Sequence, residues 1–284
     1  MDIKKDDRIL LSTRIVSALV VPFLVLAFII LYFYPETSGE RFAWEIKPNM
    51  TAAFMGSGYL GGSWLFINAV FGRRWHRIST GFLPVAAFTT AMMVTTVLHW
   101  DRFEIGHLPF TLWLILYAVT PFLLPVLWWL NHKVDFGAPE SNDPSVPKLA
   151  GLLMKVFSAA LLLFAAWAFI LPENFSTIWP WRLSPLTARI VGGWFVLMGA
   201  AGLYIARDSR WSSWRIGLEC IWVWHVLILF AAFTNRADFP GGLLNWYIIS
   251  VVLVLTGMTA LYAWIEVRRR SKHSTLKPLN TTPA

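Results

Sequence analysis

Long apolar stretches alternate with short polar segments along the whole chain. A helix needs about 20 mostly apolar residues to cross the hydrocarbon core of a bilayer, and each stretch meets or nearly meets that length. The apolar positions run continuously, which favours helices over the alternating strands of a membrane barrel. The stretches are Ile15–Phe33, Pro48–Gly72, Ile78–Trp100, Ile105–His132, Val156–Pro172, Ile190–Ala206, Ile216–Asn235 and Phe239–Ile265. The pattern predicts an all-α integral membrane protein with eight transmembrane helices.

Composition excludes the main alternatives to a membrane protein. Of the 284 residues, 57% are hydrophobic and only 14% are charged, whereas about 25% are charged in ordinary soluble domains. A soluble globule could not bury so much apolar surface, and the aromatic content argues against a disordered chain. The single cysteine, Cys220, excludes a disulfide framework and a thiolate metal cluster.

The basic residues predict the orientation of the chain in the bilayer. If the N-terminus is cytoplasmic, 18 of the 24 Lys and Arg residues fall in cytoplasmic segments and 6 fall outside. Cytoplasmic loops carry an excess of Lys and Arg. Both termini are therefore expected on the cytoplasmic side of a plasma or inner cell membrane. The net charge of +8 then reflects topology, and it does not require nucleic acid as a partner.

The sequence also contains an internal duplication. At an offset of 137 residues Pro35-Glu36 matches Pro172-Glu173, and at an offset of 136 Arg74-Trp75 matches Arg210-Trp211. Further matches include Trp44 with Trp181. Four helices return the chain to the side of the membrane from which it started, so both repeats enter from the same side. We therefore predict two parallel four-helix repeats related by a pseudo-two-fold axis along the membrane normal.

The duplication divides the chain into four parts. Residues 1–138 form the first repeat and residues 148–270 form the second. Residues 139–147, which contain three prolines and Asp143, are expected to form a cytoplasmic linker, and residues 271–284 a disordered cytoplasmic tail.

Two ionisable residues in the seventh apolar stretch are candidates for a ligand or proton path. His225 lies near the middle of that stretch, where an ionisable side chain is a functional hypothesis by default. The alternative is a neutral histidine that hydrogen-bonds locally. Glu219 follows Arg215 by one helical turn, so an ion pair between them is the alternative to a role in proton coupling.

Trp44, Trp181 and Arg189 extend the candidate path to the outer side. Trp44 and Trp181 occupy equivalent outer loops and could stack on a ligand, although tryptophan also gathers at membrane interfaces for its amphipathic ring alone. Arg189 lies directly before the sixth stretch, where its long side chain can extend to the membrane–water interface.

A polar outer loop is a weak candidate for a metal site. His99, Asp101, Glu104 and His107 lie within nine residues and offer nitrogen and oxygen ligands. Their spacing fits no familiar zinc pattern. The alternative is an interfacial loop whose acidic residues pair with Arg102 or with an arginine of a neighbouring loop.

Small residues predict where helices pack closely. Gly58 and Gly62 form a small-xxx-small motif of the kind that brings membrane helices together, and further glycines lie near Gly192 in the equivalent helix. Packing is the simpler interpretation, and backbone exposed to a ligand between the repeats is the functional one.

Three functions follow from these features. The first is transport of a small solute or ion along a path between the repeats. The second is a structural or accessory role in a larger membrane complex. The third is a membrane redox or metal-dependent enzyme, although the sequence contains no nucleotide-binding, hydrolase or haem-attachment motif. We predict no cofactor. The expected partners are the lipid bilayer and either a second membrane protein or another copy of the chain.

Overall fold

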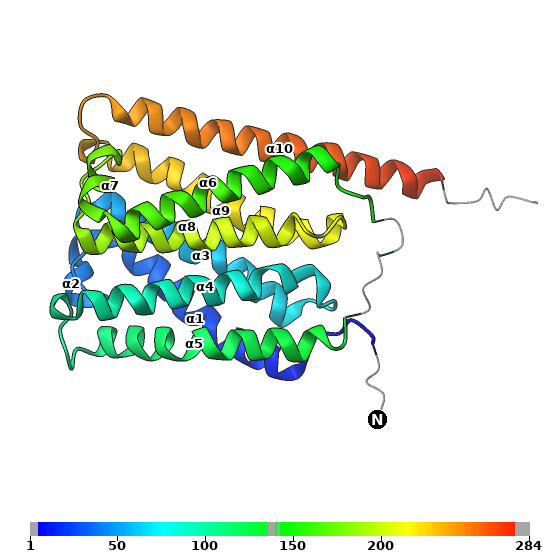
Figure 1. The fold of residues 1–284 in the computed structure, drawn as a ribbon, viewed down its shortest axis with the longest axis horizontal. Helices are drawn as coiled ribbons and strands as arrows, with labels where there is room; N and C mark the ends of the chain where they lie inside the picture. The colour runs from blue at the N-terminus through cyan, green and yellow to red at the C-terminus, as the bar shows by residue number, and fades with distance from the viewer. Residues whose placement is uncertain (1–4, 136–139, 141–142, 276–284) are drawn as a thin grey trace, which may run out of the picture.

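The computed structural model describes residues 5–135, 140 and 143–275, together with the side chains of all of these except 271–275. Within these residues the protein is all-helical, without strands. The long helices are α1 (Leu11–Phe33), α3 (Asn49–Phe71), α4 (His76–Leu98), α5 (Leu108–His132), α6 (Lys148–Ile170), α8 (Pro185–Ile205), α9 (Trp211–Thr234) and α10 (Leu243–Thr275). They lie side by side in one elongated bundle (Figure 1).

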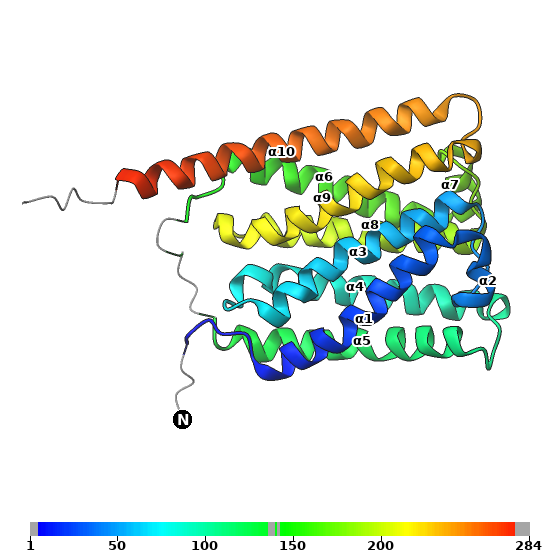
Figure 2. The ribbon, with the colours of Figure 1, turned by 180° about the vertical axis from the view of Figure 1, so that it is seen from behind.

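Short helices occupy the connections at one end of the bundle. They are η1 (Pro35–Thr37), α2 (Ser38–Arg41), η2 (Trp100–Arg102), α7 (Pro172–Ile178) and η3 (Arg236–Asp238). The N-terminal segment and the described parts of the connection between α5 and α6 lie at the opposite end, as both views show (Figures 1 and 2). We call the first end the loop end and the second the terminal end.

The prediction of an all-helical protein is confirmed, and the structure is compatible with an integral membrane protein. Seven of the long helices in the described part of the chain are long and apolar enough to cross a membrane. The long helix outside this set is α3, which has 23 residues and no formal charge but contains four glycines, two serines and a threonine. Most of its side chains are buried, so its neighbours shield it from lipid. The C-terminal helix α10 continues to Thr275, five residues past the predicted end of the second repeat, and residues 276–284 of the predicted tail lie outside the described residues.

The long helices form an inner and an outer group. Helix α3 packs on α9, α4 packs on α8, and α4 also contacts α9. The outer helices α1, α5, α6 and α10 cover α3, α4, α8 and α9 respectively, and their outward faces carry many exposed large apolar side chains. Such faces suit the apolar surroundings of a bilayer, in which lipid tails are as apolar as leucine.

Large aromatic rings fill the space between the inner helices. The buried indole of Trp194 on α8 lies 4.5 Å from the Phe88 ring, 5.2 Å from Tyr59 and 5.0 Å from Trp224, measured between centroids. The hydroxyl groups of Tyr59 and Tyr117 lie 2.9 Å apart and satisfy each other. These rings come from α3, α4, α5, α8 and α9, so they hold the inner helices together and close the middle of the bundle.

Glycine makes this ring packing sterically feasible. A Cβ atom on Gly58 of α3 would lie 2.6 Å from the Trp194 ring, and one on Gly61 would lie 2.7 Å from the Cys220 carbonyl oxygen of α9. Nothing lies within 4 Å of the corresponding position on Gly62. The close approach therefore depends on Gly58 and Gly61, and the second glycine of the Gly58–Gly62 motif does not take part.

Replacing Gly58 should weaken the bundle, because the buried Trp194 ring has no room to yield. We expect Gly58→Ala to destabilise the protein by about 1–3 kcal/mol, the usual cost of overpacking a core. Thermal unfolding of the purified protein in detergent measures the effect. Gly62→Ala on the same helix is the matched control and should unfold at the wild-type temperature. Equal melting temperatures for Gly58→Ala and Gly62→Ala would contradict the packing argument.

Candidate functional site

The candidate path residues predicted from the sequence do not converge on one place. His225 on α9 donates from Nδ1 to the Ile221 carbonyl oxygen, 2.8 Å away, within its own helix. This is the local hydrogen bond that the simpler interpretation expects of a histidine inside an apolar helix. Its ring also lies 6.1 Å from that of Trp224.

Glu219 lies near the terminal end of α9 and accepts hydrogen bonds from three helices. Its donors are Arg215 Nε at 2.9 Å, the Tyr262 hydroxyl at 2.9 Å and Trp64 Nε1 at 2.8 Å. The ion pair with Arg215 agrees with the sequence spacing. Tyr262 and Trp64 come from α10 and α3, so helical periodicity could not reveal them. Glu219 thus links α3, α9 and α10 and lines an apolar groove of about 390 Å³ between α9 and α10.

Trp44 and Trp181 are buried at the loop end, with exposed fractions of 6% and 1%. Trp44 packs edge-to-face on Trp113 and Phe103. Trp181 donates from Nε1 to Thr51 Oγ1, 2.8 Å away on α3. Both rings therefore contact the protein's own side chains, and Trp181 ties a loop of the second half to the first.

Arg189 joins the two halves at the loop end. Its Nη1 lies 2.7 Å from His99 Nε2, and its Nε donates to the Phe169 carbonyl oxygen at 3.0 Å. Arginine has no acceptor and stays charged in proteins, so His99 Nε2 must accept this bond and the ring must be neutral. Burial and the positive charge of Arg189 lower the pKa of His99 below its ordinary value.

The proposed metal ligands do not gather into a site. Asp101 pairs with its neighbour Arg102 at 3.2 Å, and both are exposed. Glu104 is exposed on the loop, and its carbonyl oxygen accepts from the His107 amide at 3.2 Å. Among the described residues no group of three or more His, Cys, Asp and Glu side chains could hold a metal ion.

The densest polar cluster lies instead at the terminal end, where the first residues of α4 and α9 meet. His76 Nδ1 lies 2.5 Å from Asp7 Oδ2, and His76 Nε2 lies 3.0 Å from Ser212 Oγ. Ser212 donates to Asp143 Oδ2 at 2.5 Å, and Glu140 Oε1 lies 3.1 Å from His76 Nε2. We call these five residues the seam cluster.

The two sides of the seam cluster have matching backbone contacts. The His76 amide donates to Asp7 Oδ1 and the Ser212 amide donates to Asp143 Oδ1, each at 3.0 Å. Carboxylates near a helix N-terminus satisfy amides that have no partner within the helix. The N-terminal segment and the connection between α5 and α6 are thereby fastened to α4 and α9.

The seam cluster has the atoms of a Ser-His-Asp triad but not the necessary proton positions. A nucleophilic serine must donate to the imidazole, which then acts as the general base. Here Ser212 donates to Asp143, and His76 Nε2 faces Glu140 as well as Ser212. The Ser212 proton is thus directed toward Asp143 and away from His76, which does not match the geometry of an activated serine.

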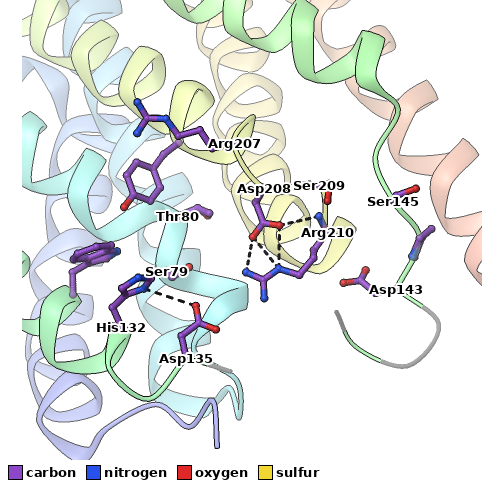
Figure 3. Close-up of a pocket in the computed structure, with 13 residues that line it drawn as sticks. Ser79, Thr80, His132, Asp135, Asp143, Ser145, Arg207, Asp208, Ser209 and Arg210 are labelled. Atoms are coloured by element: carbon purple, nitrogen blue, oxygen red, sulfur yellow. Dashed lines mark hydrogen bonds and ion pairs between the residues drawn. The ribbon is translucent and has the colours of Figure 1, made fainter. Parts of the chain in front are cut away.

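A polar pocket of about 580 Å³ opens beside the seam cluster. Side chains from both halves line it: Ser79, Thr80, Trp128, His132 and Asp135 from the first, and Tyr204, Arg207, Asp208, Ser209 and Arg210 from the second, with Asp143, Pro144 and Ser145 between them. Figure 3 shows these side chains around the opening. Its size falls within the usual range for small-molecule sites.

We call this opening the seam pocket. Some of its charged side chains form ion pairs with each other. Arg210 Nη2 lies 2.7 Å from Asp208 Oδ2 (Figure 3). Burial acts to raise the pKa of Asp208, but the hydrogen bonds from Arg210 outweigh it and the net pKa is lowered. His132 stacks on Trp128 at 4.6 Å, and the Arg207 guanidinium lies 5.7 Å from the Tyr204 ring centre. The pocket thus offers both charges and aromatic faces to a polar ligand.

The seam cluster was not predicted from the sequence, although a signal for it is present there. The repeat offset that aligns Arg74-Trp75 with Arg210-Trp211 also aligns His76 with Ser212 and Asp7 with Asp143. Equivalent residues near a two-fold axis meet each other, so a polar pair at such positions points to a site at the axis.

Comparison of the chain with protein-family models, curated proteins and solved structures gave no match. The geometry of the seam pocket and the seam cluster is therefore the basis for inferring a function.

The contact between His99 and Arg189 should make stability depend on pH. Because the pKa of His99 is lower in the folded protein than in the unfolded chain, the stabilisation is complete above about pH 6.5 and is lost as the pH falls. In His99→Gln the amide oxygen can accept from Arg189 at every pH. We expect the melting temperature to fall less between pH 7 and pH 5 in this variant than in the wild type.

His107→Gln is the control, because it removes a histidine from the same loop without touching Arg189. It should retain the wild-type dependence on pH. Parallel melting curves for wild type and His99→Gln would show that His99 contributes nothing to the pH dependence.

Proposed function

We propose that this protein is a multi-pass membrane transporter for a small polar solute or ion, with the seam pocket as the inner vestibule of a path between two halves. The observation that carries the proposal is the seam pocket itself, which is polar, about 580 Å³ in volume and lined from both halves. A site at the boundary of two units can open and close when one unit moves against the other.

The proposal includes the eight-span topology with two parallel repeats. Its support is the recurrence of elements: residues 11–132 and 148–275 contain the same order of long helices, each with a 3₁₀ turn before its last helix. Contacts recur as well, since α3 on α9 and α4 on α8 exchange under a two-fold rotation. With cytoplasmic termini, the seam pocket faces the cytoplasm and lies among the basic residues that favour this side.

The same proposal assigns the aromatic rings between the inner helices to the closed part of the path. Trp194, Tyr59 and Phe88 are buried and in mutual contact through Trp194. A solute in the seam pocket would reach the outer side only after these rings separate. Alternating access therefore requires the two halves to move relative to each other, beginning at the polar contacts that join them at each end.

An accessory role in a larger membrane complex is the second candidate. The filled centre of the bundle favours it, because a structural subunit needs no internal path. The apolar groove beside Glu219 and the exposed side chains of α10 would then face a partner helix. Membrane enzymes are the third candidate, but the hydrogen-bond directions in the seam cluster do not support an activated serine.

Uptake into proteoliposomes tests the transport proposal. We expect the reconstituted full-length chain to take up at least one solute from a panel of inorganic ions, amino acids and small organic cations or anions. Ser209 is exposed and lines the seam pocket, so Ser209→Trp should fill the vestibule and reduce uptake at least tenfold. Ser209→Ala keeps the pocket open and should transport at the wild-type rate.

Two results would contradict the transport proposal. One is uptake no faster than in empty liposomes across the whole panel. The other is equal uptake by Ser209→Trp and Ser209→Ala. Migration of the chain in native membranes as a stable assembly with a second protein, combined with absent uptake, would favour the accessory role.

A further inference from the structure

An apolar groove of about 390 Å³ lies between α9 and α10, at the edge of the bundle (Figures 1 and 2). Leu218, Trp222 and Val223 of α9 and Met258 of α10 form much of its wall. Trp222 is 46% exposed, so the groove opens on the outside of the bundle. Both helices are long and apolar enough to cross a membrane, and in a bilayer the groove therefore faces lipid.

The polar side chains along the groove are already paired with each other. Glu219 accepts from Tyr262 and from Trp64, and Trp222 Nε1 donates to Thr259 Oγ1 at 3.2 Å. The surface that these residues leave in the groove is apolar. A charged or strongly polar group placed there would lose water and gain no hydrogen bond, which is costly. The groove therefore favours an apolar occupant.

The groove has a local cause in the sequence of α9. At the repeat offset of 136 residues Trp222 corresponds to Ala86 of α4. Ala86 and Phe82 pack directly with Leu124 of α5 in one buried cluster. Trp222 is far larger than alanine, and its hydrogen bond to Thr259 places it between α9 and α10. These two helices therefore cannot close on each other as α4 and α5 do.

Two exposed tryptophans on α10 indicate the depth of the groove in a bilayer. Trp246 and Trp264 are 73% and 42% exposed, and their separation of 18 residues corresponds to about 27 Å along a helix. The hydrocarbon core of a bilayer is about 30 Å thick, and tryptophan gathers at both of its boundaries. The part of the groove formed by Met258 and Tyr262 therefore lies just inside the boundary near Trp264, toward the terminal end.

Arginines follow the groove toward the terminal end. Arg215 lies one turn before Glu219 on α9, and Arg268 and Arg269 lie in the last part of α10. Arg215 Nη1 and Arg269 Nε lie 3.9 and 3.5 Å from Glu266, which is longer than an ordinary hydrogen bond. Their side chains are 40% and 39% exposed, so an anionic group can reach them. Three guanidinium groups accompany the carboxylates of Glu219 and Glu266, and the excess charge is positive.

The occupant must therefore be apolar just inside the boundary and negative just outside it. A transmembrane helix would lie over the groove without filling it, because about one turn of a helix 10 Å across and 5.4 Å in pitch already has the volume of the groove. A phospholipid acyl chain is slender and flexible enough to enter. Its phosphate also suits arginine, whose planar N–H donors bind phosphate oxygens well.

We propose that the groove between α9 and α10 is a binding site for one anionic phospholipid. One acyl chain lies in the groove against Trp222 and Met258, and the anionic headgroup lies at the terminal end beside Arg215 and Arg269. Basic residues next to a membrane segment attract anionic lipid, and the groove restricts this attraction to one place. The inference goes beyond the transport proposal, because it requires only that the chain lies in a bilayer.

Native mass spectrometry of the full-length chain in detergent tests the site. Dioleoyl phosphatidylglycerol and dioleoyl phosphatidylcholine are titrated separately, since they share their acyl chains and differ in the net charge of the headgroup. We expect the first phosphatidylglycerol to bind about tenfold more tightly than the first phosphatidylcholine, because the arginines favour a negative lipid. Equal affinities for the two lipids would overturn the inference.

Matched variants locate the site. Val223→Trp fills the groove and should lower the affinity for the first phosphatidylglycerol to that for later, unspecific lipids. Val252→Trp makes the same change at an exposed position of α10 outside the groove and should bind as the wild type does. Arg269→Gln should weaken binding about fivefold, the effect of one basic residue on an anionic lipid. Arg236→Gln removes an exposed arginine at the loop end and should leave binding unchanged. Equal affinities in Val223→Trp and Val252→Trp would contradict a site in the groove.

Photo-crosslinking of the wild type keeps the test independent of how the variants fold. Phosphatidylglycerol that carries a diazirine in one acyl chain is bound and irradiated, and the labelled peptides are identified by mass spectrometry. We expect the label on the peptides of α9 and α10 that contain Trp222 and Met258. Label spread evenly over the outer helices would refute the site. A stable dimer that Val223→Trp dissociates would also refute it, because a second copy of the chain would then cover the groove.

Discussion

The close packing of rings against glycine at the centre of the bundle is the constraint on which the rest of the structure depends. Helices in a bilayer gain little from burying apolar surface against one another, because lipid is equally apolar. They associate through close contacts, and here the contacts are those of Trp194 with Gly58 and Tyr59 of α3 and with Phe88 of α4. The inner helices therefore have a fixed separation, and the outer helices pack on a surface already defined.

Polar contacts between the halves gather at the two ends, and others lie along the bundle, such as those of Trp64 with Glu219 and of Trp224 with the Phe54 carbonyl oxygen. At the loop end Arg189 binds His99, Trp181 binds Thr51, and Asp238 accepts from the Met50 amide at 2.8 Å. At the terminal end the seam cluster joins α4 to α9. Polar groups at these depths can exchange protein partners for water more readily than groups in the apolar middle. Under the transport proposal, relative motion of the halves would therefore begin where hydrogen bonds can be replaced, and the rings in the middle would separate last.

The sequence predicted the helices well because continuous apolar runs are a direct consequence of bilayer thickness. It predicted the local pairing of Glu219 with Arg215 and allowed a local hydrogen bond for His225, since both lie within one helical turn. It could not predict the donation from Trp64 and Tyr262 to Glu219, or the burial of Trp44 and Trp181, because these depend on how separate helices meet. The seam cluster was missed because Asp7, His76, Glu140 and Ser212 lie far apart in sequence, and only the repeat offset relates His76 to Ser212.

His76 and Ser212 occupy equivalent positions in the two halves but are different residues. This difference has a physical basis if the two halves derive from one four-helix unit. Equivalent residues near a two-fold axis contact each other, so two identical side chains there must be able to bind one another. Here a histidine from one half meets a serine from the other. His76 Nδ1 faces Asp7 Oδ2, His76 Nε2 faces Ser212 Oγ, and Ser212 donates to Asp143 Oδ2. The two unlike side chains thus form one continuous hydrogen-bonded chain from Asp7 to Asp143, and this chain joins α4 to α9 at the terminal end.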